Sequence, residues 1–168
     1  MEKRKWSIRL GELSTLLYLL FPIISIFNEK RGSQTVYLIV LAIFIVSYLM
    51  LVIYYYRFNN NVIYSLLVVH YVGIIYFVYT INPMNSLFFF FSAFALPFMF
   101  EVTINSKEFI TFIIAMLLCL TITSFYQIEY VSVLIIFYLV ILIITLGNFK
   151  TKKDRALKKE IEEKNKYI

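Results

Sequence analysis

The sequence predicts an all-α membrane protein: a polytopic bundle of six transmembrane helices, followed by a cytoplasmic C-terminal helix that starts a coiled coil. The composition indicates this class. Of the 168 residues, 61% are hydrophobic and only 15% are charged, whereas a soluble domain carries about 25% charged residues. The apolar residues also form long runs rather than short amphipathic stripes. A soluble fold of this size would have too few polar side chains to cover so much apolar surface.

Six apolar runs have the length of a membrane-spanning helix, which needs about 20 mostly apolar residues to cross about 30 Å of hydrocarbon. They cover residues 10–27, 35–56, 62–81, 84–103, 109–126 and 131–149. A transmembrane β-strand would instead have about 10 residues of alternating polarity, and no run shows that alternation. The connections between the runs are short, so sequential helices are expected to be antiparallel neighbours in an up-and-down bundle.

The first three runs differ in their polar content. The first begins with Gly11 and Glu12 and contains Pro22, whereas the second contains neither a charge nor a proline. The third contains His70, the only histidine of the chain. An ionisable residue inside a bilayer is a functional candidate, although a neutral histidine bonded to a hydroxyl of a neighbouring helix is the simpler interpretation.

The last three runs contain a proline and several small polar residues. The fourth follows a turn at Asn82-Pro83, contains Pro97, and has Glu101 near its end as a second intramembrane polar candidate. Small residues of the fifth and sixth runs can support close helix contacts. They are Thr121, Thr123, Ser124, Ser132, Thr145 and Gly147.

Lysine and arginine residues predict the orientation, because cytoplasmic loops carry an excess of them. With six crossings, one side holds Lys3, Arg4, Lys5, Arg9, Arg57, Lys107 and the basic C-terminal tail. The other side holds only Lys30 and Arg31. Both termini are therefore expected in the cytoplasm. If the first run lies along the interface, five crossings remain and the N-terminal basic residues lie outside, against this rule.

The tail, residues 150–168, differs sharply from the preceding apolar run. It reads KTKKDRALKKEIEEKNKYI and contains no Gly or Pro that would stop a helix. Three Asp/Glu–Lys pairs have the favourable i,i+4 order: Asp154–Lys158, Glu160–Lys164 and Glu162–Lys166. Leu157, Ile161 and Ile168 fit a heptad seam, with Lys164 at one core position. This pattern predicts a helix that pairs with another helix, and the seam is still open at Ile168.

Known catalytic and metal-binding motifs are missing from the sequence. It has no Gly-rich phosphate loop, no nucleophile with a neighbouring base, and no His and carboxylate residues at metal-ligand spacing. The single cysteine, Cys119, excludes a disulfide scaffold. The basic residues cluster at membrane boundaries, which favours a lipid bilayer over nucleic acid as the partner. No enzyme activity and no cofactor are expected within these 168 residues.

Several apolar runs with short loops, followed by the charged helix KTKKDRALKKEIEEKNKYI, resemble the sensor half of a bacterial DesK-type histidine kinase. The resemblance in type and spacing covers Leu157, Lys158, Lys159, Glu160, Ile161, Glu162, Glu163, Asn165 and Ile168. In that family, the helix continues into a phosphoacceptor domain and an ATP-binding domain. The resemblance therefore implies that ATP, Mg²⁺ and a response regulator are bound only by a kinase domain beyond Ile168.

The chain departs from the family pattern at identifiable positions. The family's phosphoacceptor is a cytosolic histidine beside an acidic residue, whereas His70 lies in an apolar run and is followed by Tyr71. The serine-rich face of the family's last span is reduced here to Ser132 and Thr145. The ATP-binding motifs are missing from these residues. The resemblance is thus to the membrane sensor without its kinase domain.

The sequence-based hypothesis is a sensor in the bacterial cell membrane that detects bilayer thickness, fluidity or a membrane-active compound. The candidate sensing residues are Lys5, Arg9 and Glu12, which would sink or surface as thickness changes. The candidate signal-transmission residues are Gly147, Asn148, Leu157, Ile161 and Ile168. A homodimer through the last span and the tail is the expected assembly. The alternative is a small multipass transporter or immunity-type subunit, which would need a polar path through the bundle.

Overall fold

The computed structural model describes residues 13–168, and the secondary structure within that range is entirely helical. Four helices are long and apolar enough to cross a membrane. They are α3 (Gln34–Ile53), α4 (Asn60–Thr80), α6 (Lys107–Tyr126) and α7 (Val131–Asn165). The predicted all-helical class is confirmed, and the four long apolar helices of the described residues are those of a chain that could span a membrane.

Two shorter apolar stretches, Thr15–Phe27 and Pro83–Met99, are built from several helix types. The first consists of η1 (Thr15–Leu19), α2 (Leu20–Ile24) and η2 (Ser25–Phe27). The second consists of η4 (Pro83–Phe88), α5 (Phe89–Phe94) and the π-helical segment η5 (Ala95–Met99). Short 3₁₀ turns also precede α4 and α7, namely η3 (Tyr55–Arg57) and η6 (Ile128–Tyr130).

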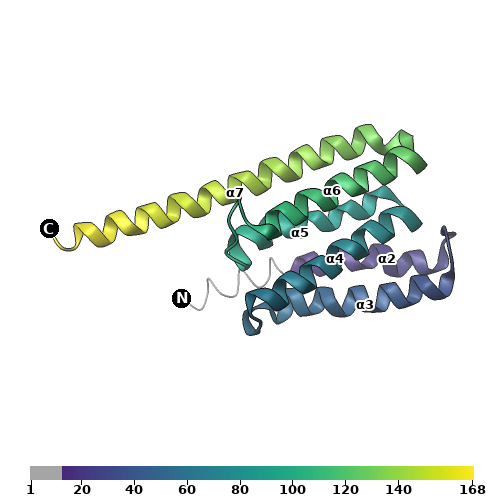
Figure 1. The fold of residues 1–168 in the computed structure, drawn as a ribbon, viewed down its shortest axis with the longest axis horizontal. Coiled ribbons are helices and arrows are strands. Elements are labelled where there is room, and N and C mark those ends of the chain that lie inside the picture. The colour runs from purple at the N-terminus through teal and green to yellow at the C-terminus, as the bar shows by residue number, and fades with distance from the viewer. Residues whose placement is uncertain (1–12) are drawn as a thin grey trace.

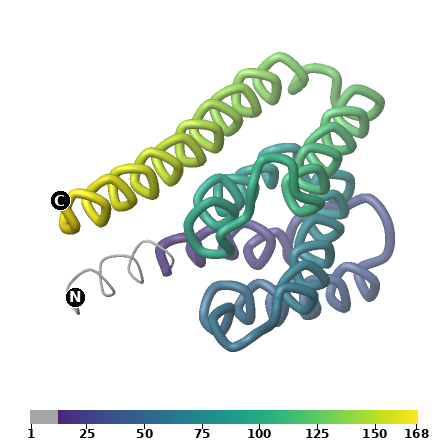
Figure 2. The backbone as a smooth tube through the Cα atoms, turned by 60° about the vertical axis from the view of Figure 1, so that its left-hand side comes forward, coloured from purple at the N-terminus to yellow at the C-terminus, as the bar shows by residue number. Residues whose placement is uncertain are grey.

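The helical stretches run up and down in one bundle, as Figures 1 and 2 show. The Tyr37 hydroxyl donates to the Pro22 carbonyl, and the Tyr48 hydroxyl donates to the Thr15 carbonyl. The later residue of α3 thus contacts the earlier residue of the first stretch, so the two helical stretches are antiparallel. Contacts between α4 and α3, between α4 and α6, and between α5 and α7 complete the bundle.

The fourth apolar stretch is shorter than the predicted residues 84–103. Its helix ends at Met99, and Glu101 has a backbone φ of 51°, in the left-handed region. The N–H of Val102 bonds back to the carbonyl of Leu96 at 2.9 Å. Pro97 has no N–H and cannot continue an α-helical ladder. Glu101 therefore lies in the loop after the helix, at the end of the bundle from which the tail leaves.

The core of the bundle is rich in aromatic rings, and α3 and α4 approach each other closely where they cross. Phe44 on α3 packs edge-to-face against Phe77 and Phe88, with ring centroids 4.9 and 5.0 Å apart. A β-carbon built on Gly73 of α4 would clash with Cδ2 of Phe44. Only glycine therefore lets α3 and α4 approach this closely.

The last span and the tail form one continuous helix, α7, from Val131 to Asn165. The predicted helix over the tail is confirmed, and it projects well beyond the bundle (Figure 1). Of the three i,i+4 ion pairs expected there, the described chain contains only Glu160–Lys164, at 2.8 Å. The exposed tail gives the other pairs no packing that would hold their long side chains in place.

Candidate functional site

Side-chain hydrogen bonds join the helices inside the bundle. Tyr71 on α4 bonds to Ser92 on α5 at 2.7 Å, and Ser86 on η4 bonds to Tyr138 on α7 at 2.9 Å. Each pair satisfies polar groups that would otherwise be exposed to an apolar environment. These hydroxyls therefore hold helices together and are not arranged as a polar path.

His70 lies in the middle of the core and is completely buried. Its ring stacks against Phe44 and Tyr48 of α3, with centroids 5.2 and 4.9 Å away, and meets the edges of Phe88 and Phe91. Within residues 13–168, neither ring nitrogen has a hydrogen-bond partner. The expected bond to a hydroxyl of a neighbouring helix is thus replaced by aromatic packing.

The junction between the last span and the tail is fastened to the fourth stretch by Asn148. In an α-helix the carbonyl of Ala93 would accept the N–H of residue 97, but that residue is a proline and has no N–H. The side-chain amide of Asn148 on α7 donates to this carbonyl at 2.9 Å. One helix therefore supplies the hydrogen-bond donor that another helix lacks, at the place where α7 leaves the bundle.

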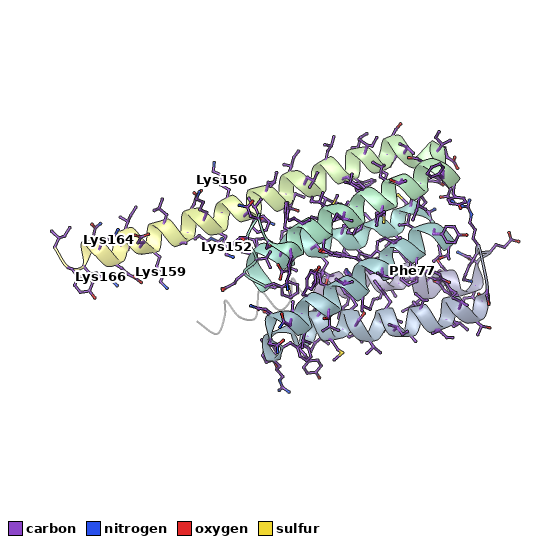
Figure 3. The ribbon with its side chains drawn as sticks, in the orientation of Figure 1. Phe77, Lys150, Lys152, Lys159, Lys164 and Lys166 are labelled. Atoms are coloured by element: carbon purple, nitrogen blue, oxygen red, sulfur yellow. The ribbon has the colours of Figure 1, made fainter. Side chains whose placement is uncertain are left out.

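Two basic residues of α7 extend this contact towards the tail. The Lys152 ammonium lies 3.4 Å from the carbonyl of Val102, and the Arg155 guanidinium lies 5.7 Å from the ring centroid of Phe98. Figure 3 shows Lys152 on the side of α7 that faces the bundle and Lys150 on the other side. Together with Asn148, these residues recur every three or four positions and so share one face of α7.

The apolar residues of the tail lie on a different face of α7. Ile161 follows Lys152 by nine residues, which is about two and a half helical turns, so it points away from the bundle side. Leu157 and Ile161 are 55% and 50% exposed, respectively. A β-carbon added at Gly147 would meet no atom within 4 Å. Leu157 and Ile161 of the predicted seam are therefore not covered by the described part of the chain, and they lie on a different face of α7 from the residues that contact the bundle.

At the opposite end of the bundle, two basic residues, Lys30 and Arg31, bond to backbone carbonyls at the ends of helices. The Lys30 ammonium bonds to the Ile26 carbonyl at 2.7 Å, at the end of the first stretch. The backbone N–H of Arg31 bonds to the Thr80 carbonyl, and its guanidinium bonds to the Tyr126 carbonyl. Cations are favourable at helix C-termini, where carbonyls lack partners. Lys30 and Arg31 thus tie three helix ends together.

The structure places the predicted residues in separate regions. Lys5, Arg9 and Glu12 lie outside the described residues, 13–168. His70 is in the core, Glu101 is in an exposed loop, and Gly147 and Asn148 are at the junction. The sequence did not predict the contact of Asn148 with Ala93. Nor did it predict those of Lys152 and Arg155 with the fourth stretch and its loop. Two signals in the sequence could have suggested these contacts: the polar Asn148 at the end of one apolar run, and Pro97 near the end of another.

No group of three or more His, Cys, Asp or Glu side chains within residues 13–168 could hold a metal ion. Comparisons with protein-family models, with curated proteins and with solved structures found no match for the chain.

Proposed function

We propose that the chain is the membrane-embedded sensor part of a bacterial two-component histidine kinase. It would detect the thickness or fluidity of the bilayer, or a membrane-active compound. The observation that carries this proposal is the continuity of α7, which runs from an apolar span into a charged helix without a break between Val131 and Asn165. A rigid helix of this kind can carry a rotation or a shift from the membrane to a cytoplasmic domain.

The proposal includes six membrane crossings. The ends of α4 and α6 meet the loop after the first stretch through Arg31, which bonds to Thr80 and Tyr126. At the other end, Lys152 of α7 meets the loop after η5. The loop after the first stretch and the loop after η5 therefore lie at opposite ends of the bundle. This arrangement supports a membrane crossing by each of the two shorter stretches. The six residues of 3₁₀ helix in η4 also rise by about 2.0 Å each, which lengthens that stretch relative to an α-helix.

A second copy of the chain is the partner that we propose for the seam at Leu157 and Ile161. The tail leaves the bundle as an exposed helix, so its own bundle does not cover these residues. A polar residue at a core position, here Lys164, weakens a coiled coil while it fixes its register. Weak pairing suits a helix that must change its position during signalling.

The free energy of a change in bilayer thickness is similar in size to that of the polar contacts that hold α7 at the Asn148 junction. Mismatch between a helix and the bilayer costs fractions of a kcal/mol per Å. Several crossings in two copies add such contributions, and a two-state equilibrium with a gap of a few kcal/mol responds to a difference of that size. The few long-range polar contacts at the Asn148 junction are of similar strength. The membrane can therefore compete with them.

A transporter or immunity-type subunit has less support. A transport path would require polar side chains that face a common channel. His70 is instead enclosed by aromatic rings, and the buried hydroxyls of Tyr71 and Tyr138 are paired with serines of the fourth stretch. The two possibilities also differ in the gene sequence beyond the tail. A kinase requires a phosphoacceptor histidine and an ATP-binding domain after residue 168, whereas a small transport subunit does not.

The test is autophosphorylation of the full-length gene product in vesicles of short-chain and long-chain phosphatidylcholine. We expect the rate with ATP to differ several-fold between the two bilayers. An equal rate in both would contradict thickness sensing. A stop codon directly after that of Ile168 would contradict the kinase assignment itself.

A further inference from the structure

We infer that the segment from Ala93 to Val102 is a latch that fixes the rotational position of α7. When the latch is closed, the tail side of α7 keeps one face against the fourth stretch; when it opens, this part of α7 can turn. The inference rests on the proposed function, because it describes how the output helix is held. The latch itself is a physical contact within one chain and can be tested without any kinase output.

The latch consists of three contacts along one face of α7. Asn148 bonds to the Ala93 carbonyl at 2.9 Å, Lys152 reaches the Val102 carbonyl at 3.4 Å, and Arg155 lies over Phe98. A helical residue turns the chain by about 100°. Rotation of α7 by a single residue would therefore remove all three contacts together, so that they act as one unit.

The first contact replaces the backbone hydrogen bond that Pro97 cannot donate. A backbone carbonyl without a donor is costly in an apolar environment, and Pro97 removes the α-helical donor for Ala93. Within α5 and η5 the chain leaves the α-helical ladder: the N–H of Phe100 bonds to the Ala95 carbonyl at 2.8 Å, five residues back. The donor for Ala93 comes from α7, and a donor on another helix is lost when that helix moves.

The other two contacts are easy to break. The Lys152 contact is long, and both Lys152 and Arg155 stand where the helix emerges from the bundle, so water can replace their partners. Phe98 is also partly exposed, at 39%. By contrast, Thr145 and Ile141 of α7 are buried deeper in the bundle. Opening is therefore expected to begin at the tail side and to depend on Asn148.

The experiment measures the distance between the two sides of the latch in native membranes. Phe98→Cys and Arg155→Cys are introduced together in the full chain, which replaces the third contact and leaves those of Asn148 and Lys152 to hold the latch. The yield of a short thiol crosslinker is then determined. Addition of Asn148→Ala should lower the yield about fivefold, as expected for the loss of one net hydrogen bond. Thr151→Ala is the matched control, because the Thr151 hydroxyl bonds to the Gly147 carbonyl of its own helix.

A double-mutant comparison makes the test specific. Pro97→Ala restores an N–H at residue 97, so Asn148→Ala should then change the crosslinking yield less than twofold. A second cysteine pair, Tyr79→Cys and Tyr126→Cys, joins α4 to α6 at the opposite end of the bundle and reports whether each variant has folded. Wild-type protein, whose only cysteine is the buried Cys119, should give no product.

Two results would overturn the latch: an unchanged yield with Asn148→Ala in folded protein, or an equally large loss in the Pro97→Ala background. The bilayer dependence is a separate outcome. A yield that responds to Asn148→Ala but is identical in thin and thick bilayers would support the latch and contradict the proposed sensing of thickness.

Discussion

The amide of Asn148 and the carbonyl of Ala93 form a hydrogen bond of 2.9 Å across 55 residues of sequence. Ala93 precedes Pro97 by four residues, so this carbonyl is the one that loses its α-helical donor to the proline. The bond therefore couples an irregularity in the fourth apolar stretch to the point where α7 leaves the bundle as the exposed tail. The break at Pro97 therefore affects more than its own helix, because the neighbouring helix α7 provides the donor for the Ala93 carbonyl.

Close packing of α3 on α4 predicts a large difference between two glycine substitutions. Gly73→Ala should destabilise the protein by roughly 1–3 kcal/mol, because the added methyl group overpacks against Phe44. Gly147→Ala should instead be neutral or stabilise by up to about 1 kcal/mol, because its site is open and alanine favours a helix. Thermal unfolding midpoints of the purified variants in detergent test this difference. Equal midpoints would show that α3 and α4 can separate without cost.

Aromatic packing around His70 predicts that a nonpolar ring is better tolerated there than a polar side chain. A buried polar group without a partner costs about 1–3 kcal/mol. His70→Phe should therefore raise the thermal unfolding midpoint, by about 2–8 °C per kcal/mol gained. His70→Gln should not raise it, since glutamine retains polar atoms and loses the stacking on Phe44 and Tyr48.

The control for the His70 series is Tyr71→Phe, on the same helix. It removes the hydroxyl that bonds to Ser92 at 2.7 Å and should lower the midpoint by the equivalent of about 1 kcal/mol. If His70→Phe lowered the midpoint as much as Tyr71→Phe does, the imidazole would have a polar partner in the folded protein, such as a buried water molecule.

The proposed orientation predicts which loops a membrane-impermeant thiol reagent can reach. Glu29→Cys lies in the exposed loop after the first stretch and should be labelled in intact cells. Asn60→Cys lies at the start of α4, at the opposite end of the bundle, and should be labelled only after lysis. The buried Cys119 provides the unlabelled background in wild-type protein. The reverse labelling pattern would invert the proposed topology.

Much of the fold was predictable because hydrophobic length decides where helices form. The long runs predicted α3, α4, α6 and the start of α7 within a few residues, and the tail was correctly predicted to be helical. The end of the fourth stretch was not predicted well. Hydropathy does not register the missing N–H of Pro97, which together with the left-handed Glu101 ends the helix at Met99.

The contacts of the candidate site were less predictable than its location. Gly147 and Asn148 stood out because composition changes there, but the partner of Asn148 is 55 residues away and depends on three-dimensional packing. His70 was recognised as an isolated histidine, yet its environment was not, since the rings around it come from α3 and from the fourth stretch. Sequence patterns identify polar residues in apolar runs, whereas tertiary packing decides their partners.

The last prediction concerns signal transmission through α7 and uses alanine insertions between Arg155 and Ala156. At this position, the contacts of Asn148, Lys152 and Arg155 with the bundle are retained, and only the seam at Leu157 and Ile161 is rotated. One inserted residue turns everything after it by about 100°. Seven inserted residues restore the phase to within about 20°. Output should therefore be abolished or locked by one residue and largely recovered by seven.

The measurement is autophosphorylation of the full-length protein at two bilayer thicknesses, for insertions of one to seven alanines. Insertions of three or four residues, each close to one helical turn, should retain more of the response than insertions of two or five. This periodicity distinguishes a rotating helix from a flexible tether, because a tether responds only to length. A response that is the same for every insertion would mean that the continuous helix from Val131 to Asn165 does not transmit the rotation that the proposed function requires.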